Sequence, residues 1–172
     1  METTIENSMA DFSRRLAGFR ENEPDKRDLD RFEDDCSEIS DRLRTLQEAL
    51  KKNFFCYSQL FDTGVRYALP SISAIAGIKD VPDDSIEARV RTLVERMRNL
   101  MEKGHDEAEM RKISIVFLET RRNLDDLDTA LKKIDKDYWQ FWNDWYDRNH
   151  ACRQDLKSEW KKRMEQQTTI IF

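Results

Sequence analysis

Apolar residues recur along this chain at the spacings of amphipathic α-helices. In the first block they lie 3 or 4 residues apart and stop before Pro24, which predicts a helix over 4–21. The second block keeps a strict 3, 4 alternation from Leu29 to Leu50, the spacing of a coiled-coil seam. Beyond Leu50 the apolar positions shift to an 11-residue spacing, so the seam is expected to straighten locally while one helix covers 25–68.

The second half of the chain adds two more such blocks. A low-charge connection over 70–82 holds two of the three prolines, and we expect a short apolar turn of helix within it. A third helix is predicted over 83–103, ended by Gly104, and a last one over 106–166, where uninterrupted helix would be roughly 90 Å long. The predicted fold class is all-α: an elongated antiparallel helical bundle or coiled coil with one very long C-terminal helix, in one domain spanning 1–172.

Two helix starts carry residues at capping-box spacing. Thr3 and Glu6 stand three apart at the start of the first block, and Asp84 and Glu87 do so at the start of the third. We therefore expect Thr3 and Asp84 to cap these helices.

A cluster of aromatic residues lies in the last predicted helix, in the stretch YWQFWNDWY. Its members are Tyr138, Trp139, Phe141, Trp142, Trp145 and Tyr146. At 100° per residue they span an arc of roughly 160°, whereas the apolar residues just upstream span about 80°. Since one neighbouring helix covers only the narrower arc, two neighbours are expected at the cluster, from this chain or from a second copy.

Three interpretations of this cluster differ in what covers it. The favoured one is a core or dimer interface, because aromatic stripes at helical spacing are usually packed. A membrane-interface belt is the second, although such helices prefer a basic polar face and residues 136–150 hold two basic against three acidic side chains. A base-stacking platform is the third and least favoured, because stacking surfaces lie in electropositive grooves.

A second contact surface is predicted around three further apolar residues. Phe55 points away from the seam of its helix, and Ile115 and Leu118 belong to the segment ISIVFL, which is apolar on nearly all sides. The favoured alternative is that the connection 70–82 folds over one of these places and makes it part of the core.

Composition limits the environment and the partners. Charged residues make up 38% of 172 residues and the net charge is −5, so the chain as a whole would be repelled by nucleic acid and anionic lipid. Three widely spaced cysteines without a CxxC pair suit a reducing compartment. With no apolar run of 18 residues and no signal-like N-terminus, we expect an intracellular, cytoplasmic protein that binds no nucleic acid.

Patterns that carry catalysis or metal binding are weak. Glu102-x-x-His105 and Asp147-x-x-His150 match the acid-x-x-His spacing of di-iron bundles, but Gly104 lies within the first and the second has Asp for Glu. No nucleophile stands in a recognised context and the four glycines are isolated, so no phosphate loop is present. We expect no enzyme, no metal and no cofactor, with a ligand-binding or di-metal bundle as the least favoured function class.

Basic doublets recur about 11 residues apart along the last predicted helix. They are Arg111-Lys112, Arg121-Arg122 and Lys132-Lys133, interleaved with acidic residues. Solvated ion pairs are the favoured interpretation, and a weak basic track for anionic lipid or an acidic partner is the alternative.

The predicted function is a non-enzymatic helical protein–protein interaction module, a scaffold or adaptor subunit that self-associates or joins a coiled-coil assembly. Its expected partner is itself, as a homodimer, or another protein. The alternative is a membrane-surface module, because an amphipathic N-terminal helix ahead of three longer helices is similar in layout to the BAR family. That resemblance implies lipid contact by residues 2–21, which hold three basic against four acidic side chains.

Overall fold

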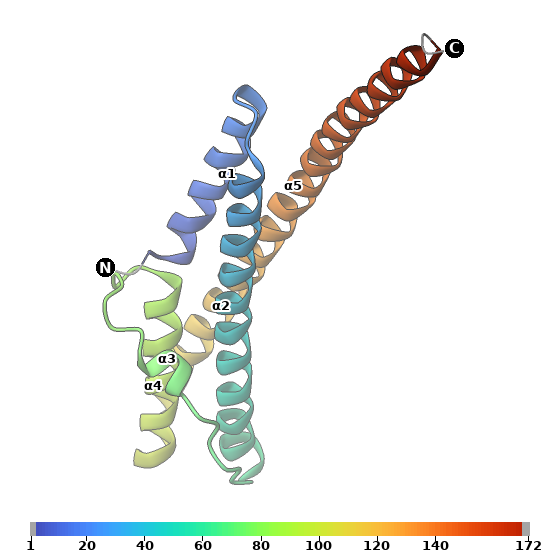
Figure 1. Cartoon of the computed structure of the whole chain (residues 1–172). Helices are drawn as coiled ribbons and strands as arrows, with labels where there is room; N and C mark the ends of the chain where they lie inside the picture. The colour runs from blue at the N-terminus through green and yellow to red at the C-terminus, as the bar shows by residue number, and fades with distance from the viewer. Residues whose placement is uncertain (1–2, 170–172) are drawn as a thin grey trace. The chain divides into compact units, whose positions relative to one another are not determined.

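The computed structural model describes residues 3–169, except for the side chains of 151–157 and 166–169. Within this range the chain is helical and contains no strand, which confirms the all-α class and the very long C-terminal helix (Figure 1). The elements are α1 (Ile5–Glu21), α2 (Lys26–Ser58), a π-helical turn η1 (Gln59–Thr63), α3 (Ser73–Ala76), α4 (Ile86–Lys103) and α5 (Glu107–Thr169).

By its contacts the chain divides into two units. The N-terminal unit, residues 1–134, contains α1 to α4 and the first part of α5, and the C-terminal unit, residues 135–172, contains the rest of α5. The N-terminal unit is a helical bundle with its own apolar core. That all 172 residues form a single domain stays a prediction.

Helices α1 and α2 pack as an antiparallel hairpin in the N-terminal unit. The apolar face of α1 is buried, and its members are Ile5, Met9, Phe12 and Leu16. On α2, Phe32 is fully buried and meets the rings of Phe12 and Phe19 edge-on, each with a centroid separation of 5.6 Å. Arg15 of α1 lies over the Phe32 ring and pairs with Asp35 at 2.6 Å, so two residues one turn apart on α2 both contact α1.

Helix α4 runs parallel to α2, whereas α5 runs antiparallel to it. Arg42 pairs with Glu87 and Asn53 with Arg98, both at an offset of 45 residues, which only parallel helices can keep. The long connection between η1 and α4 makes this possible because it returns the chain to the starting end of the bundle. The α2–α4 pair is therefore an exception to the predicted antiparallel packing.

The end of the second predicted helix differs from the expectation. The helix was predicted to reach residue 68, but it ends in η1 at Thr63, and Gly64 follows in the left-handed conformation with φ of 74°. A glycine adopts this conformation at little cost, and it ends the helix there. As a result, Val65 and Ala68, which continue the apolar spacing, are exposed rather than buried.

The N-termini of α1 and α4 meet and cap each other. The carboxylate Oε1 of Glu6 in α1 accepts a hydrogen bond from the backbone N–H of Ile86 at 2.8 Å, and Oε1 of Glu87 in α4 accepts one from Ile5 at 2.9 Å. Each glutamate thus satisfies a first-turn N–H of the other helix, one of the groups that a helix leaves unpaired. We call this arrangement the reciprocal cap.

The residues beside the reciprocal cap correct the predicted capping. Thr4 and Ser85, rather than Thr3 and Asp84, are the N-caps, each accepting a hydrogen bond from the backbone N–H three residues later. The two helix starts therefore share the pattern Thr/Ser-Ile-Glu. Because each isoleucine is buried and each glutamate crosses to the other helix, the pattern joins the two ends into one structure.

Arg42 of α2 supplies positive charge to the reciprocal cap. Its guanidinium donates to Glu87 Oε1 at 2.9 Å and to the backbone carbonyl of Thr3 at 3.0 Å. The Glu87 side chain is only 2% exposed, and burial raises the pKa of its carboxyl above the ordinary value. The nearby Glu6 adds to the rise, whereas backbone hydrogen bonds and Arg42 oppose it.

Changing Glu87 to glutamine should remove a pH dependence of stability. A carboxyl whose folded-state pKa is raised contributes stability that is fully present below its unfolded pKa, near 4.5, and is lost as pH rises through the higher folded value. The free energy of unfolding of the natural chain should therefore fall relative to Glu87→Gln between pH 4 and 7, as measured by urea unfolding at fixed protein concentration. A difference that stays constant over this range would contradict the raised pKa.

Candidate interaction surfaces

The aromatic cluster of the C-terminal unit divides into a buried and an exposed half. Tyr138 and Phe141 are 2% and 8% exposed, whereas Trp139 and Tyr146 are 40% and 44% exposed. Trp142 and Trp145 are half-buried. The wide arc predicted from the sequence is thus present, and its exposed half is left open in the single chain.

The exposed half forms a continuous row of rings along α5. Trp139 meets Trp142 edge-on at 5.6 Å, Trp142 stacks on Tyr146 at 5.0 Å, and Tyr146 stacks on His150 at 5.4 Å. The steps of three and four residues keep these side chains on one face of the helix. We call this row, Trp139, Trp142, Tyr146 and His150, the aromatic ladder.

The face of the aromatic ladder continues toward the end of α5. Trp160 and Met164 follow Trp142 and Tyr146 by 18 residues, which is five turns of α-helix, and both are exposed. The exposed apolar side chains therefore recur on one face of the C-terminal unit over more than twenty residues.

The charge of the C-terminal unit changes sign along its length. Residues 135–150 hold four acidic and two basic residues, whereas 151–166 hold three acidic and five basic residues. The half that carries the aromatic ladder is thus acidic and the half that follows is basic.

The second predicted surface lies in the N-terminal unit, where Phe55, Ile115 and Leu118 are all exposed. Phe55 lies on α2, whereas Ile115 and Leu118 lie on α5, and the three do not form one patch. Phe55 meets Tyr67 at a centroid separation of 5.3 Å, so the chain after η1 covers part of it. The rest of the segment ISIVFL is divided, since Ile113 and Phe117 are buried in the bundle.

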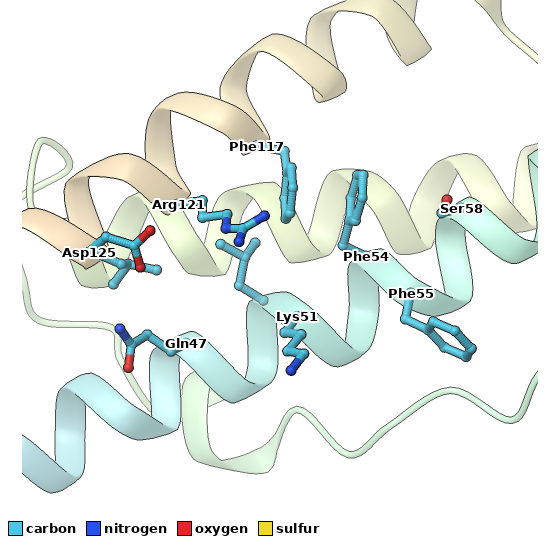
Figure 2. A pocket seen from close by; sticks show the side chains of 10 residues that line it. Gln47, Lys51, Phe54, Phe55, Ser58, Phe117, Arg121 and Asp125 are labelled. Carbon is cyan, nitrogen blue, oxygen red and sulfur yellow. The ribbon is translucent and has the colours of Figure 1, made fainter. Parts of the chain in front are cut away.

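A groove lies between α2 and α5 in the N-terminal unit, with a volume of about 470 Å³. Phe54 of α2 and Phe117 of α5 stack face to face within it, with centroids 3.6 Å apart (Figure 2). Leu50, Leu124 and Phe55 complete its apolar lining. Its polar residues are Gln47, Lys51, Ser58, Arg121 and Asp125.

The basic doublets of α5 have different surroundings. Arg111 pairs with Glu107 and Lys132 with Asp128, each one turn apart at the surface, which agrees with the ion-pair interpretation. Arg121 extends beside the Phe54 and Phe117 rings instead, as Figure 2 shows. The spacing of the basic residues in the sequence does not distinguish this doublet from the other two.

Neither acid-x-x-His pattern brings metal ligands together among the side chains that the structure describes. Gly104 caps the end of α4, so His105 lies between two helices, where its ring meets Phe61 edge-on. His150 belongs to the aromatic ladder. Among the residues that the structure describes, no three His, Cys, Asp or Glu side chains are grouped as a metal ion requires.

Tyr57 is a second titratable group with a shifted pKa. Burial, followed by the charges of Asp62 and Glu109, raises the pKa of its hydroxyl, which lies beneath the surface without a hydrogen-bond partner. A phenol with a raised pKa is a weaker proton donor than an ordinary tyrosine.

Comparisons with protein-family models, curated protein sequences and solved structures find no match to this chain. In the described part of the chain no helix is long and apolar enough to cross a membrane.

Proposed function

We propose that the protein is a non-enzymatic helical interaction module that forms a homodimer through the C-terminal part of α5. The observation that carries the proposal is the aromatic ladder, a row of large rings left open to solvent on a single helix. Large exposed aromatic surface is costly in water and is typical of protein-binding sites. A scaffold or adaptor role follows from such an interface combined with the absence of a recognised catalytic pattern in the sequence.

Charge complementarity favours a second copy as the partner. Two C-terminal units that pair antiparallel, with their centre near His150, bring each acidic half alongside the partner's basic half. The same pairing sets Trp139 of one ladder next to Trp160 of a second copy. A parallel pairing would bring acidic half against acidic half.

The membrane-surface alternative has less support. It depends on an N-terminal helix that can insert into lipid, and the apolar face of α1 is buried against the bundle. Lipid contact would require α1 to leave α2 and to break the reciprocal cap.

The dimer is tested by Tyr146→Glu, with Gln140→Glu as the matched control. Tyr146 lies within the aromatic ladder, whereas Gln140 is exposed about 120° around the same helix. Both variants add one negative charge. Because a two-fold dimer contains the change twice, the dissociation constant should rise roughly hundredfold for Tyr146→Glu and change little for Gln140→Glu.

The measurement is the molar mass by light scattering and sedimentation over a tenfold range of concentration. The natural chain and Gln140→Glu should have the mass of a dimer, and added salt should weaken both. A natural chain that stays monomeric throughout, or a Tyr146→Glu variant that stays dimeric, would contradict the proposal. Circular dichroism should show equal helix content in both variants.

A further inference from the structure

The groove between α2 and α5 combines an aromatic floor with two basic side chains. The Phe54 and Phe117 rings stack at its centre, and Leu50 and Leu124 extend the apolar lining. Arg121 from α5 extends beside the Phe117 ring, whereas Lys51 lines the groove from α2 with its ammonium group turned away from the rings (Figure 2). A volume of about 470 Å³ lies within the range of small-molecule sites in proteins.

Neither Lys51 nor Arg121 forms an ion pair with a residue that the structure describes. Other basic residues nearby do, such as Lys52 with Glu48 on α2 and Arg111 with Glu107 on α5. Asp125 stands one turn after Arg121, the usual position for a helical ion pair, yet the two side chains do not pair. The groove thus has two basic side chains without an ion-pair partner next to apolar surface, and its lining also contains the carboxylate of Asp125.

We propose that this groove binds a medium- or long-chain carboxylate. The acid group accepts hydrogen bonds from the Arg121 guanidinium beside the rings, and on binding the flexible Lys51 side chain swings over the groove to add an ammonium donor. The hydrocarbon chain follows Leu50 and the stacked rings toward Phe55. Gln47 and Ser58 mark the two ends of the groove on α2, and eleven residues of helix separate them by roughly 16 Å, room for a chain of about ten carbons.

The ligand is a free acid rather than a peptide helix or a membrane lipid. A docked helix needs a row of apolar anchor sites over two or more turns, and this groove has one aromatic centre with charges beside it. A lipid headgroup would need a basic surface around the groove, but Asp125 lines the groove itself and Glu48 lines the neighbouring pocket that shares Lys51 and Phe55. The net negative charge of the chain also opposes an anionic membrane.

The test is calorimetric titration of the full chain with decanoate, kept below its micelle concentration, and with decan-1-ol. One decanoate should bind per chain, at least tenfold more tightly than the alcohol, which has the same hydrocarbon chain and no charge. Lys51→Gln and Arg121→Gln should each weaken decanoate binding roughly tenfold and leave alcohol binding unchanged. Lys52→Gln and Arg122→Gln, the neighbouring basic residues, are the matched controls and should bind decanoate as the natural chain does.

A separate variant tests the hydrocarbon end of the groove. Phe55→Asp places a negative charge at an exposed position that lines the groove, so decanoate binding should be lost while helix content stays the same. Equal affinity for acid and alcohol, or an acid preference that survives the double change Lys51→Gln and Arg121→Gln, would overturn the proposal. Co-sedimentation with phosphatidylserine vesicles that depends on these two residues would also overturn it, in favour of lipid.

Discussion

Replacing Arg42 with methionine is expected to lower the free energy of unfolding by about 3 kcal/mol at pH 7. Methionine keeps much of the aliphatic packing but removes the guanidinium that donates to Glu87 and to the Thr3 carbonyl. A buried carboxylate then loses its charged partner beside the second carboxylate of Glu6, at the point where two helices meet. Breaking one partner of a buried pair costs more than the pair itself contributes.

Arg44→Met is the control for this change. Arg44 lies on the same helix and pairs with Asp41, but both side chains are mostly exposed, so its loss should cost no more than about 0.5 kcal/mol. Urea unfolding of both variants at one protein concentration gives the comparison. The cost of Arg42→Met should shrink toward pH 4, where Glu87 is protonated, and a cost as small as that of Arg44→Met at pH 7 would contradict the role of Arg42.

The reciprocal cap shows a limit on what local sequence patterns can predict about structure. Capping-box spacing predicted that Glu6 and Glu87 would serve their own helices through Thr3 and Asp84. Each glutamate serves the other helix instead, because the two helix starts, about 80 residues apart in sequence, lie against each other. The repeated Thr/Ser-Ile-Glu pattern was visible, but spacing within one segment contains no information about which distant N–H a carboxylate reaches.

Helix boundaries were predictable where the terminating residue stood alone and not where apolar spacing continued past it. Pro24 and Gly104 interrupt the pattern, and α1 and α4 end close to them. The apolar pattern does not indicate a helix end at Gly64, because Val65 and Ala68 continue the 11-residue spacing. Gly64 ends the helix despite that spacing, because glycine adopts the left-handed backbone conformation at little cost. The π-helical turn η1 comes directly before it.

The angular width of the aromatic cluster could be predicted from the sequence. Which of its residues are buried and which are exposed could not. Angles about the helix axis place Tyr138, Phe141 and Trp145 on one side of the arc and the aromatic ladder on the other. These angles refer only to the helix itself, so they do not determine which side is buried. The groove at Phe54 and Phe117 was beyond prediction for the same reason, since it depends on how two helices approach each other.

Phe32→Ala should have the largest effect of any single change in the hairpin, lowering the free energy of unfolding by about 4 kcal/mol. Its ring is fully buried, and its removal leaves a cavity against Phe12 and Phe19, which both meet it edge-on. Each such ring pair contributes roughly 1 kcal/mol beyond buried area, and Arg15 loses the face on which its guanidinium lies. Urea unfolding at fixed protein concentration measures the loss.

Phe55→Ala is the matched control, because Phe55 lies on the same helix with 51% of its surface exposed. Its cost should stay near 1 kcal/mol, since little apolar surface leaves the core. A double-mutant cycle between Phe32 and Phe12 should give a coupling of about 1 kcal/mol, which isolates the ring contact from the cavity. If Phe32→Ala cost no more than Phe55→Ala, the hairpin of α1 and α2 would not be held by this ring, and the burial of the α1 apolar face would have to account for its stability instead.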